Sequence, residues 1–296
     1  MHVFLTGSTG YVGGHLLHHL LAAGLEVSAL VRPGSEAKLP VSEDSITILH
    51  GDATDPDSYT EELNNCDAAI HIIGVIREFP HRGINFEDAH VTATRNVVTA
   101  AADYNIQRFL YLSAVGTKHD SPSGYFSTKA RAEDIVRESG LDYTIFRPSI
   151  MFGPDDEFIN YFVDLMRTFH VIPLIGGARY RMQPVAIQDV CRVFIEALGA
   201  PETVGETYEL AGPDRYEYKR MMKIVRRIAG TWAIPVHLPK QFMKGMAKLM
   251  QRFAFFPVTE DQITMLYDEN ITNDERIWEL LGIERTGFEE GIAEYL

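Results

Sequence analysis

Apolar residues occur along roughly the first two thirds of the chain in short, nearly continuous runs that alternate with helix-like stretches. A run that is apolar at almost every position predicts a strand buried on both faces, as in a parallel sheet covered by helices. Apolar residues that recur every three or four positions predict the helices between them, as after Gly13, over 86–104 and after Tyr125. The predicted strands span 2–6, 26–31, 46–49, 68–73, 108–112 and 207–210, with one more ending at Pro148.

Three glycines follow the first predicted strand, in the stretch TGSTGYVGG. They stand three residues apart and open the first predicted helix, whose free N–H groups and positive dipole end point back at the loop. Such a loop binds phosphate: the first glycine permits a tight turn, the second admits a pyrophosphate, and the third lets the helix pack on the strand. The predicted nucleotide-binding residues of the loop are Gly7, Ser8, Thr9, Gly10, Tyr11, Val12 and Gly13.

Together, the alternating elements and the glycine loop predict an α/β fold, a doubly wound parallel sheet of the Rossmann type with a second, smaller C-terminal domain. We expect residues 1–212 to form the dinucleotide-binding domain, with 151–183 contributing to a substrate cleft. Residues 213–296 are expected to form the smaller, mostly helical domain, because Gly212-Pro213 precedes a sharp change in the charge pattern.

The chain is acidic overall, with a net charge of -14, which disfavours general binding to nucleic acid. Cys66 and Cys191 are its only cysteines, too few for a disulfide framework or a cysteine zinc site. We interpret both as structural and expect no metal site. Since no apolar stretch is long enough to span a membrane and the start lacks a basic signal-peptide region, we expect a cytoplasmic protein.

The motif TGSTGYVG resembles the TGxxGxxG fingerprint of the extended short-chain dehydrogenase/reductase family. In this fold the tip of the second strand faces the adenosine ribose, where an acid binds the 2′-OH and an arginine suits a 2′-phosphate. Arg32 occupies that tip and no acid follows until Glu36, so we predict NADP(H), with NAD(H) and an ordinary surface arginine as the alternative. The resemblance also places Asp52 and Ala53 against the adenine, unless Asp52 only forms a turn.

Further cofactor contacts are expected at the carboxyl ends of two other strands. Ile73 and Gly74 end the fourth predicted strand, and Pro148 ends the sixth. In an open parallel sheet these ends share the edge at which ligands bind. We therefore expect all three residues to border the cofactor.

Tyr125 and Lys129 stand four residues apart at the start of the helix after the fifth strand. One helical turn places both side chains on one face. The family resemblance implies that this pair is catalytic: the lysine lowers the pKa of the tyrosine, whose phenolate exchanges a proton with the substrate, and the lysine also bonds the nicotinamide ribose. The alternative is an ordinary pair on a surface helix.

Two further members of the family's catalytic set are replaced in this chain. Ala114, rather than Ser113, stands where the substrate-binding serine is usual, and His90 stands where an asparagine is usual. The proton relay and the hydroxyl that orients a carbonyl are then missing. Either Ser113 and His90 substitute in part, or His90 is a satisfied core residue.

The later runs FRPSIMFGPDDEFINYF and QPVAIQDVCRVFIEAL narrow the resemblance. With the features above, they resemble the atypical extended branch that includes the NADPH-binding accessory subunit of respiratory complex I and its bacterial and plastid relatives, over residues 1–212. The resemblance implies firm nucleotide binding and two possible functions. One is an accessory, assembly or sensor protein; the other is an active reductase, dehydrogenase or epimerase on a small or lipid-like carbonyl or hydroxyl substrate.

A strongly basic segment follows the predicted sheet. Between residues 216 and 256 there are nine Lys or Arg and one acid, and residues 240–256 predict a basic amphipathic helix. It either docks on an anionic membrane surface or acidic protein, or packs over the substrate cleft. Its cations are Lys240, Lys244, Lys248 and Arg252, and its expected apolar face is Phe242, Met243, Met246, Leu249, Met250 and Phe253.

Overall fold

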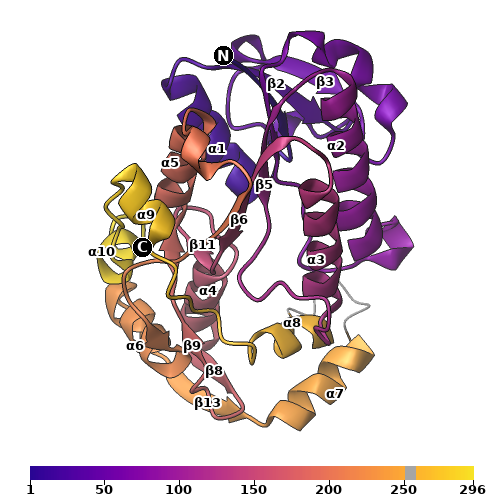
Figure 1. Ribbon diagram of the computed structural model, residues 1–296. Helices are drawn as coiled ribbons and strands as arrows, with labels where there is room; N and C mark the ends of the chain where they lie inside the picture. Colours follow the sequence, from indigo (N-terminus) through magenta and orange to yellow (C-terminus); the bar gives the residue numbers. More distant parts are fainter. Residues whose placement is uncertain (251–257) are drawn as a thin grey trace.

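A seven-stranded parallel sheet forms the centre of the protein in the computed structural model, which describes residues 1–250 and 258–296 (Figure 1). Its strand order, β11-β6-β5-β4-β1-β2-β3, runs outward from β1 in both directions. This is the predicted doubly wound sheet, and the fold class is confirmed. The strands are β1 (His2–Thr6), β2 (Glu26–Val31), β3 (Thr47–His50), β4 (Ala68–His71), β5 (Arg108–Leu112), β6 (Asp142–Pro148) and β11 (Glu206–Leu210).

The strands β1, β2 and β5 have the predicted bounds and β6 ends at Pro148 as predicted, whereas β3, β4 and β11 differ by one or two residues. The largest difference is at β4, which ends at His71 although the apolar run continues to Ile73. The carbonyl of Ile73 accepts a hydrogen bond from the Lys129 ammonium instead of continuing the ladder. A polar contact therefore ended the strand, and the apolar pattern did not reveal it.

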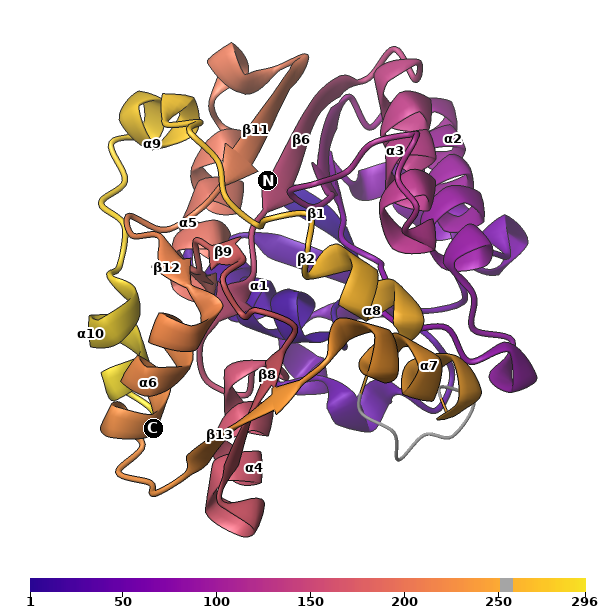
Figure 2. The ribbon, with the colours of Figure 1, turned by 90° about the horizontal axis from the view of Figure 1, so that it is seen from below.

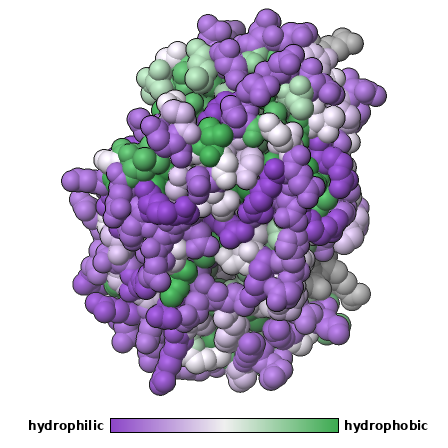
Figure 3. All heavy atoms as spheres, in the orientation of Figure 1, coloured by the Kyte–Doolittle hydropathy of each residue, from purple (hydrophilic) through white to green (hydrophobic). Residues whose placement is uncertain are grey.

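Helices cover both faces of the sheet (Figure 1). The helices α1 (Tyr11–Ala22) and α5 (Ile187–Leu198) pack on one face, and α2 (Ala93–Asp103) and α3 (Gly124–Arg137) on the other. The helix predicted over 86–104 begins as a π-helix, Glu87–Thr92, a rare geometry that is frequent at functional sites. The outer surface on the side seen in Figure 1 is mainly hydrophilic, as Figure 3 shows.

Residues after about 150 build a smaller region with its own apolar cluster. Its strands form three two-stranded ribbons, and none of its described helices is long and apolar enough to cross a membrane. Its strands are β7 (Met151–Phe152), β8 (Val171–Ile175), β9 (Arg181–Met182), β10 (Val185–Ala186), β12 (Tyr216–Glu217) and β13 (Ile234–Leu238). Its helices are α4 (Ile159–Phe169), α6 (Tyr218–Ile228), α7 (Lys240–Met250), α8 (Glu260–Met265), α9 (Arg276–Leu281) and α10 (Phe288–Ala293).

The basic helix α7 does not divide into the expected cationic and apolar faces. Met243 and Ala247 are buried against β8 and α8, but Phe242 and Leu249, expected on the same apolar face, are exposed. Lys240 lies with its ammonium 3.4 Å from the centre of the Tyr267 ring. The helix thus packs on α8 at an angle that the sequence pattern did not predict. The side chain of Met250, together with Arg252 and Phe253, lies outside the described residues.

Candidate functional site

The loop between β1 and α1 has a backbone that only glycine fits at two positions. Gly7 has a φ of +84°, and a Cβ at Gly13 would lie 2.1 Å from the Gly7 carbonyl oxygen. Among the described residues, none caps the first turn of α1 with a side chain, and that turn carries no acid. The first N–H groups of α1 are therefore free to bind an anion.

The remaining loop residues fit a pyrophosphate as well. Gly10 is exposed, so no side chain blocks the approach to the helix N-terminus. The Ser8 hydroxyl is buried and has no hydrogen-bond partner within the described chain, a state that costs about 1–3 kcal/mol until a partner is supplied. Thr9, Tyr11 and Val12 are half-buried around it. The loop is thus shaped for the phosphates of a dinucleotide.

Glu36, the first acid along the chain after Arg32, is engaged by other groups. Arg32 is exposed. Glu36 accepts a hydrogen bond from the Gly34 N–H at 3.1 Å and lies 3.2 Å from His50 Nδ1. These contacts lower the pKa of Glu36, the backbone hydrogen bonds most. Within the part of the chain that the structure describes, the Arg32 guanidinium has no hydrogen bond or ion pair, so it is available to a phosphate.

Asp52 and Ala53 follow β3, next to the expected adenine position. Asp52 Oδ1 accepts hydrogen bonds from both the N–H and the hydroxyl of Thr54, at 2.9 and 2.7 Å. Asp52 therefore does form a turn, as the alternative interpretation expected, through one of its two carboxylate oxygens. The carbonyl of the buried Ala53 accepts a hydrogen bond from Asn96. An adenine contact by either residue stays a prediction.

Lys129 reaches the carboxyl ends of β4 and β5. Its ammonium donates to the carbonyls of Ile73 and Leu112, at 3.3 and 2.9 Å, and to the Tyr111 hydroxyl at 3.4 Å. A Cβ at Gly74 would lie 3.2 Å from the ammonium, so Gly74 leaves room for it. Burial lowers the pKa of Lys129 to about 7. The lysine thus lies beside the end of β4, which was predicted to border the cofactor, and beside the end of β5.

The lysine does not activate the tyrosine in the way that the sequence implied. Tyr125 is nearly buried, and burial, with a smaller contribution from the charge of Asp261, raises its pKa to about 12. The predicted lowering of this pKa by Lys129 is therefore not seen in this structure. The phenol is protonated at neutral pH, which suits a proton donor and not a general base.

His90 is a satisfied core residue. Its Nδ1 lies 2.8 Å from the Thr128 hydroxyl, and its Nε2 accepts a hydrogen bond from the Val75 N–H at 3.2 Å. Burial and the charge of Lys129 lower its pKa to about 2, so the ring is neutral. Because both nitrogens have partners, His90 positions the chain after β4 and does not relay protons in this structure.

Neither candidate for the missing serine offers a free hydroxyl. Ser113 donates to a carboxylate oxygen of Glu133 at 2.5 Å, and Glu133 in turn binds Arg147 and Arg137. Ala114, which has no hydroxyl, packs beside Tyr125. The sequence indicated that the serine of the catalytic set is missing. In the structure, neither Ser113 nor Ala114 supplies a free hydroxyl in its place.

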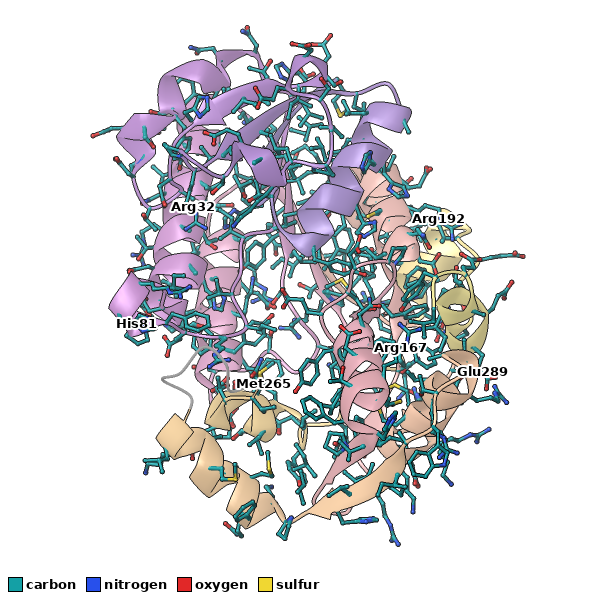
Figure 4. The ribbon with its side chains drawn as sticks, turned by 180° about the vertical axis from the view of Figure 1, so that it is seen from behind. Arg32, His81, Arg167, Arg192, Met265 and Glu289 are labelled. Carbon is teal, nitrogen blue, oxygen red and sulfur yellow. The ribbon has the colours of Figure 1, made fainter. Side chains whose placement is uncertain are left out.

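Two residues of α8 complete the site and were missed by the sequence analysis. Asp261 accepts hydrogen bonds from the Gly124 N–H at 2.7 Å and the Ser123 hydroxyl at 2.8 Å, at the start of α3. Met265 packs in one cluster with Phe86 and Tyr125. In Figures 1 and 4, α8 lies just below the N-terminal end of α3. The capping box at Thr259 signals a helix start, but nothing in the sequence signals where that helix docks.

Pro148 ends β6 beside these elements, as predicted. It is buried, and its carbonyl accepts a hydrogen bond from the Val115 N–H at 2.9 Å. This bond joins the segment after β5 to the end of β6. A direct contact between Pro148 and the cofactor stays a prediction.

Several known proteins resemble this chain in sequence and in architecture. Residues 7–165 match the model of a protein family described as NAD(P)H-binding. The chain is 31% identical over 278 residues to subunit 9 of the NADH dehydrogenase (ubiquinone) 1 alpha subcomplex, mitochondrial, of Arabidopsis thaliana, covering 90% of this chain and 69% of that protein. It is 28% identical over 270 residues to a 4-hydroxy-2-methyl-3-oxo-4-farnesyl-3,4-dihydroquinoline-1-oxide ketoreductase of Stigmatella aurantiaca, covering 84% and 79%.

Among solved structures, the dTDP-glucose 4,6-dehydratase DesIV of Streptomyces venezuelae, with NAD and TYD bound, superimposes with a TM-score of 0.77. The match covers 99% of this chain and 95% of that one, at 22% identity. At this identity the likeness shows the fold alone.

Proposed function

Because the chain belongs to the NAD(P)H-binding family, in the atypical extended branch of the short-chain dehydrogenases/reductases, we propose that it is an accessory, assembly or sensor protein that holds NADP(H). The observation that carries this proposal is the contrast between the two halves of the site. The glycine loop has the backbone and the free N–H groups that a pyrophosphate requires. Beside Tyr125, by contrast, Ser113 is bound to Glu133 and His90 has both nitrogens engaged.

The direct test is to identify the small molecules that co-purify with the protein by mass spectrometry and to titrate the ligand-free protein with NADPH in a calorimeter. We expect NADPH in the purified protein, and tight binding without consumption of the nucleotide over hours. If NADPH neither co-purifies with the protein nor binds to it at millimolar concentration, the proposal is contradicted.

The preference for NADP(H) rests on Arg32 and on the engagement of Glu36 with Gly34 and His50. We expect Arg32→Glu to weaken NADPH binding by about 2–3 kcal/mol, a factor of roughly 30–150, because a charge-assisted bond to the 2′-phosphate is replaced by repulsion. NADH binding should change little. Calorimetry with both nucleotides measures this, and Arg95→Glu, at an exposed arginine on α2, is the matched control. Equal affinity of the unmodified protein for NADPH and NADH would refute the preference.

The second candidate function is an active NADPH-dependent reductase, favoured by the placement of Tyr125 and Lys129 on one face of α3 and by the similarity to a ketoreductase. Bound NADPH would supply the hydride. The chain's own contribution would be a proton from the protonated Tyr125 hydroxyl to the carbonyl oxygen of the substrate, and Lys129 would hold the nicotinamide ribose.

For this candidate, we expect Tyr125→Phe to leave NADPH affinity nearly unchanged and Lys129→Ala to weaken it, because only the lysine contacts the ribose. Both changes should abolish any reductase activity. Nucleotide titrations and assays against small and lipid-like ketones measure both effects. If a substrate is found and Tyr125→Phe retains full kcat, another group must donate the proton.

We also propose that the protein works in the cytoplasm beside a membrane surface or an acidic protein, using the basic segment 240–256. The similarity to a subunit of a mitochondrial NADH dehydrogenase supports a partner in a larger assembly. So does the contrast between the basic segment and the acidic remainder of the chain.

A further inference from the structure

Three large apolar side chains are exposed close to where β8 and β13 begin. Trp232 is 69% exposed, Phe169 66% and Ile234 50%. His170 joins them: its carbonyl accepts the Ile234 N–H at 2.9 Å, and its ring centre lies 5.9 Å from that of Trp232. Single exposed apolar residues are common, but a Trp, a Phe and an Ile exposed at one end of a ribbon are typical of an interaction site.

Cations without acidic partners flank these residues on α6. Lys219, Lys223 and Arg226 follow one face of the helix and border a small cavity against β8 and β13. Within the described chain, none of the three has a carboxylate within 4.0 Å, whereas Arg227 on the same helix pairs with Glu289. We call the six residues the tip surface: Phe169, Lys219, Lys223, Arg226, Trp232 and Ile234.

The tip surface lies at one end of the molecule, away from the sheet. Figure 1 places α6, β8 and β13 at the lower end, and Figure 2, seen from below, shows α6, β13 and α7 across that face. Between residues 216 and 250 the chain has eight Lys or Arg and one acid. This stretch is therefore locally basic, although the chain as a whole carries a net charge of -14.

We propose that the tip surface docks the protein on the surface of a bilayer that contains anionic lipids. The indole of Trp232 and the ring of Phe169 enter the headgroup region, while Lys219, Lys223 and Arg226 contact lipid phosphates. A bilayer is favoured over an acidic protein because the apolar side chains project singly from a turn, a helix end and a strand end. A fluid surface accepts such separate projections without a matching groove.

This inference deepens the proposed placement beside a membrane and rests on it, but it moves the contact away from α7. In α7, Lys240 stacks on Tyr267, and Met243 and Ala247 are buried. Among the cations and large apolar residues in the described part of α7, Phe242, Lys248 and Leu249 are exposed and can add to the contact.

The chain offers a direct reporter of docking, because Trp232 is exposed and its only other tryptophan, Trp278, is 4% exposed. The full-length protein is mixed with vesicles of phosphatidylcholine alone or with phosphatidylglycerol added. We expect a blue shift of the Trp232 emission, and quenching by lipids brominated on the acyl chains, only with the anionic vesicles and at low salt. No shift and no quenching with anionic vesicles at low salt would overturn the proposal.

Variants then locate the surface by co-sedimentation with the same vesicles. Trp232→Ser and the double change Lys219→Gln with Lys223→Gln should each lower the partition onto anionic vesicles about tenfold or more. The matched controls are Leu280→Ser, at another exposed apolar residue, and Lys38→Gln with Arg95→Gln, which should bind as the unmodified protein does. If only Phe242→Ser in α7 lowered binding, the tip surface would not be the docking site.

Two further measurements separate this inference from its alternatives. The protein could instead bind soluble poly-glutamate as tightly as vesicles and show no quenching by brominated lipid. That result would identify a site for an acidic protein and overturn the proposed docking on a bilayer. NADPH titration of every variant shows that it is folded, and it tests the proposed nucleotide function independently. A protein that binds vesicles but not NADPH would retain the docking surface and lose only that function.

Discussion

Replacing Gly13 by alanine is expected to abolish NADP(H) binding and to destabilise the protein. The added Cβ would lie 2.1 Å from the Gly7 carbonyl oxygen and 2.7 Å from the Gly7 carbonyl carbon and the Ser8 Cα. All three are backbone atoms of the loop, so relief requires α1 to move away from β1. Overpacking of this kind costs about 1–3 kcal/mol of unfolding free energy. Because the same movement displaces the N–H groups that bind the pyrophosphate, we expect NADPH affinity to fall more than about 100-fold.

The neighbouring Gly14 is the matched control for this change. A Cβ at Gly14 meets only Pro40 side-chain atoms, the nearest at 3.5 Å, which is an ordinary contact. Since Gly14 lies inside α1, alanine there should raise the unfolding free energy by about 0.5–1 kcal/mol and leave the affinity unchanged. Urea unfolding and NADPH calorimetry on both variants measure these effects. Unchanged NADPH binding by the Gly13 variant would show that the close approach of loop and helix is not required.

Replacing Glu133 by glutamine is expected to lower the unfolding free energy by about 3–5 kcal/mol. The carboxylate is fully buried between β5, β6 and α3, where Arg147 binds both of its oxygens at 2.8 and 2.6 Å and Arg137 and Ser113 bind it as well. Glutamine keeps the shape but leaves two arginines without their counter-charge. Freeing Ser113 from this network also changes the position beside Tyr125, so any reductase activity is worth assaying in the same variant.

The loss should depend on pH with a defined sign. Burial alone would raise the pKa of Glu133, but the hydrogen bonds from Arg147, Ser113 and Arg137 outweigh it, so the pKa is lowered. A carboxylate with a lowered pKa stabilises the fold above its unfolded value, about 4.3, and this stabilisation is lost as the pH falls through the folded pKa.

We therefore expect the difference in unfolding free energy between the Glu133→Gln variant and the unmodified protein to be largest near neutral pH and to shrink in acid. Glu87→Gln is the control: Glu87 also binds an arginine through both oxygens, but at an exposed site, so its loss should be below about 1 kcal/mol. Equal losses in the two variants would contradict the buried role of Glu133.

The features that the sequence by itself determined are those that depend on neighbouring residues. A strand buried on both faces must be apolar throughout, so the bounds of β1, β2 and β5 followed from the pattern alone. The glycine loop was equally local. Gly7 is required by its own positive φ, and Gly13 by its close approach to Gly7 in the same loop. The position of Arg32 at the tip of β2 followed from the bounds of that strand, because Arg32 is the next residue.

Only the tertiary structure decided what surrounds those elements. Asp261 contacts Gly124 across 137 residues of chain, and burial, with a smaller contribution from the charge of Asp261, raises the pKa of Tyr125. The amphipathic pattern of α7 predicted a helix but not the angle at which it packs, which leaves Phe242 exposed and Met243 buried. A periodic sequence specifies which residues share a helix face, whereas the neighbour that covers that face, and therefore its charge and solvent exposure, comes from segments far away in the chain.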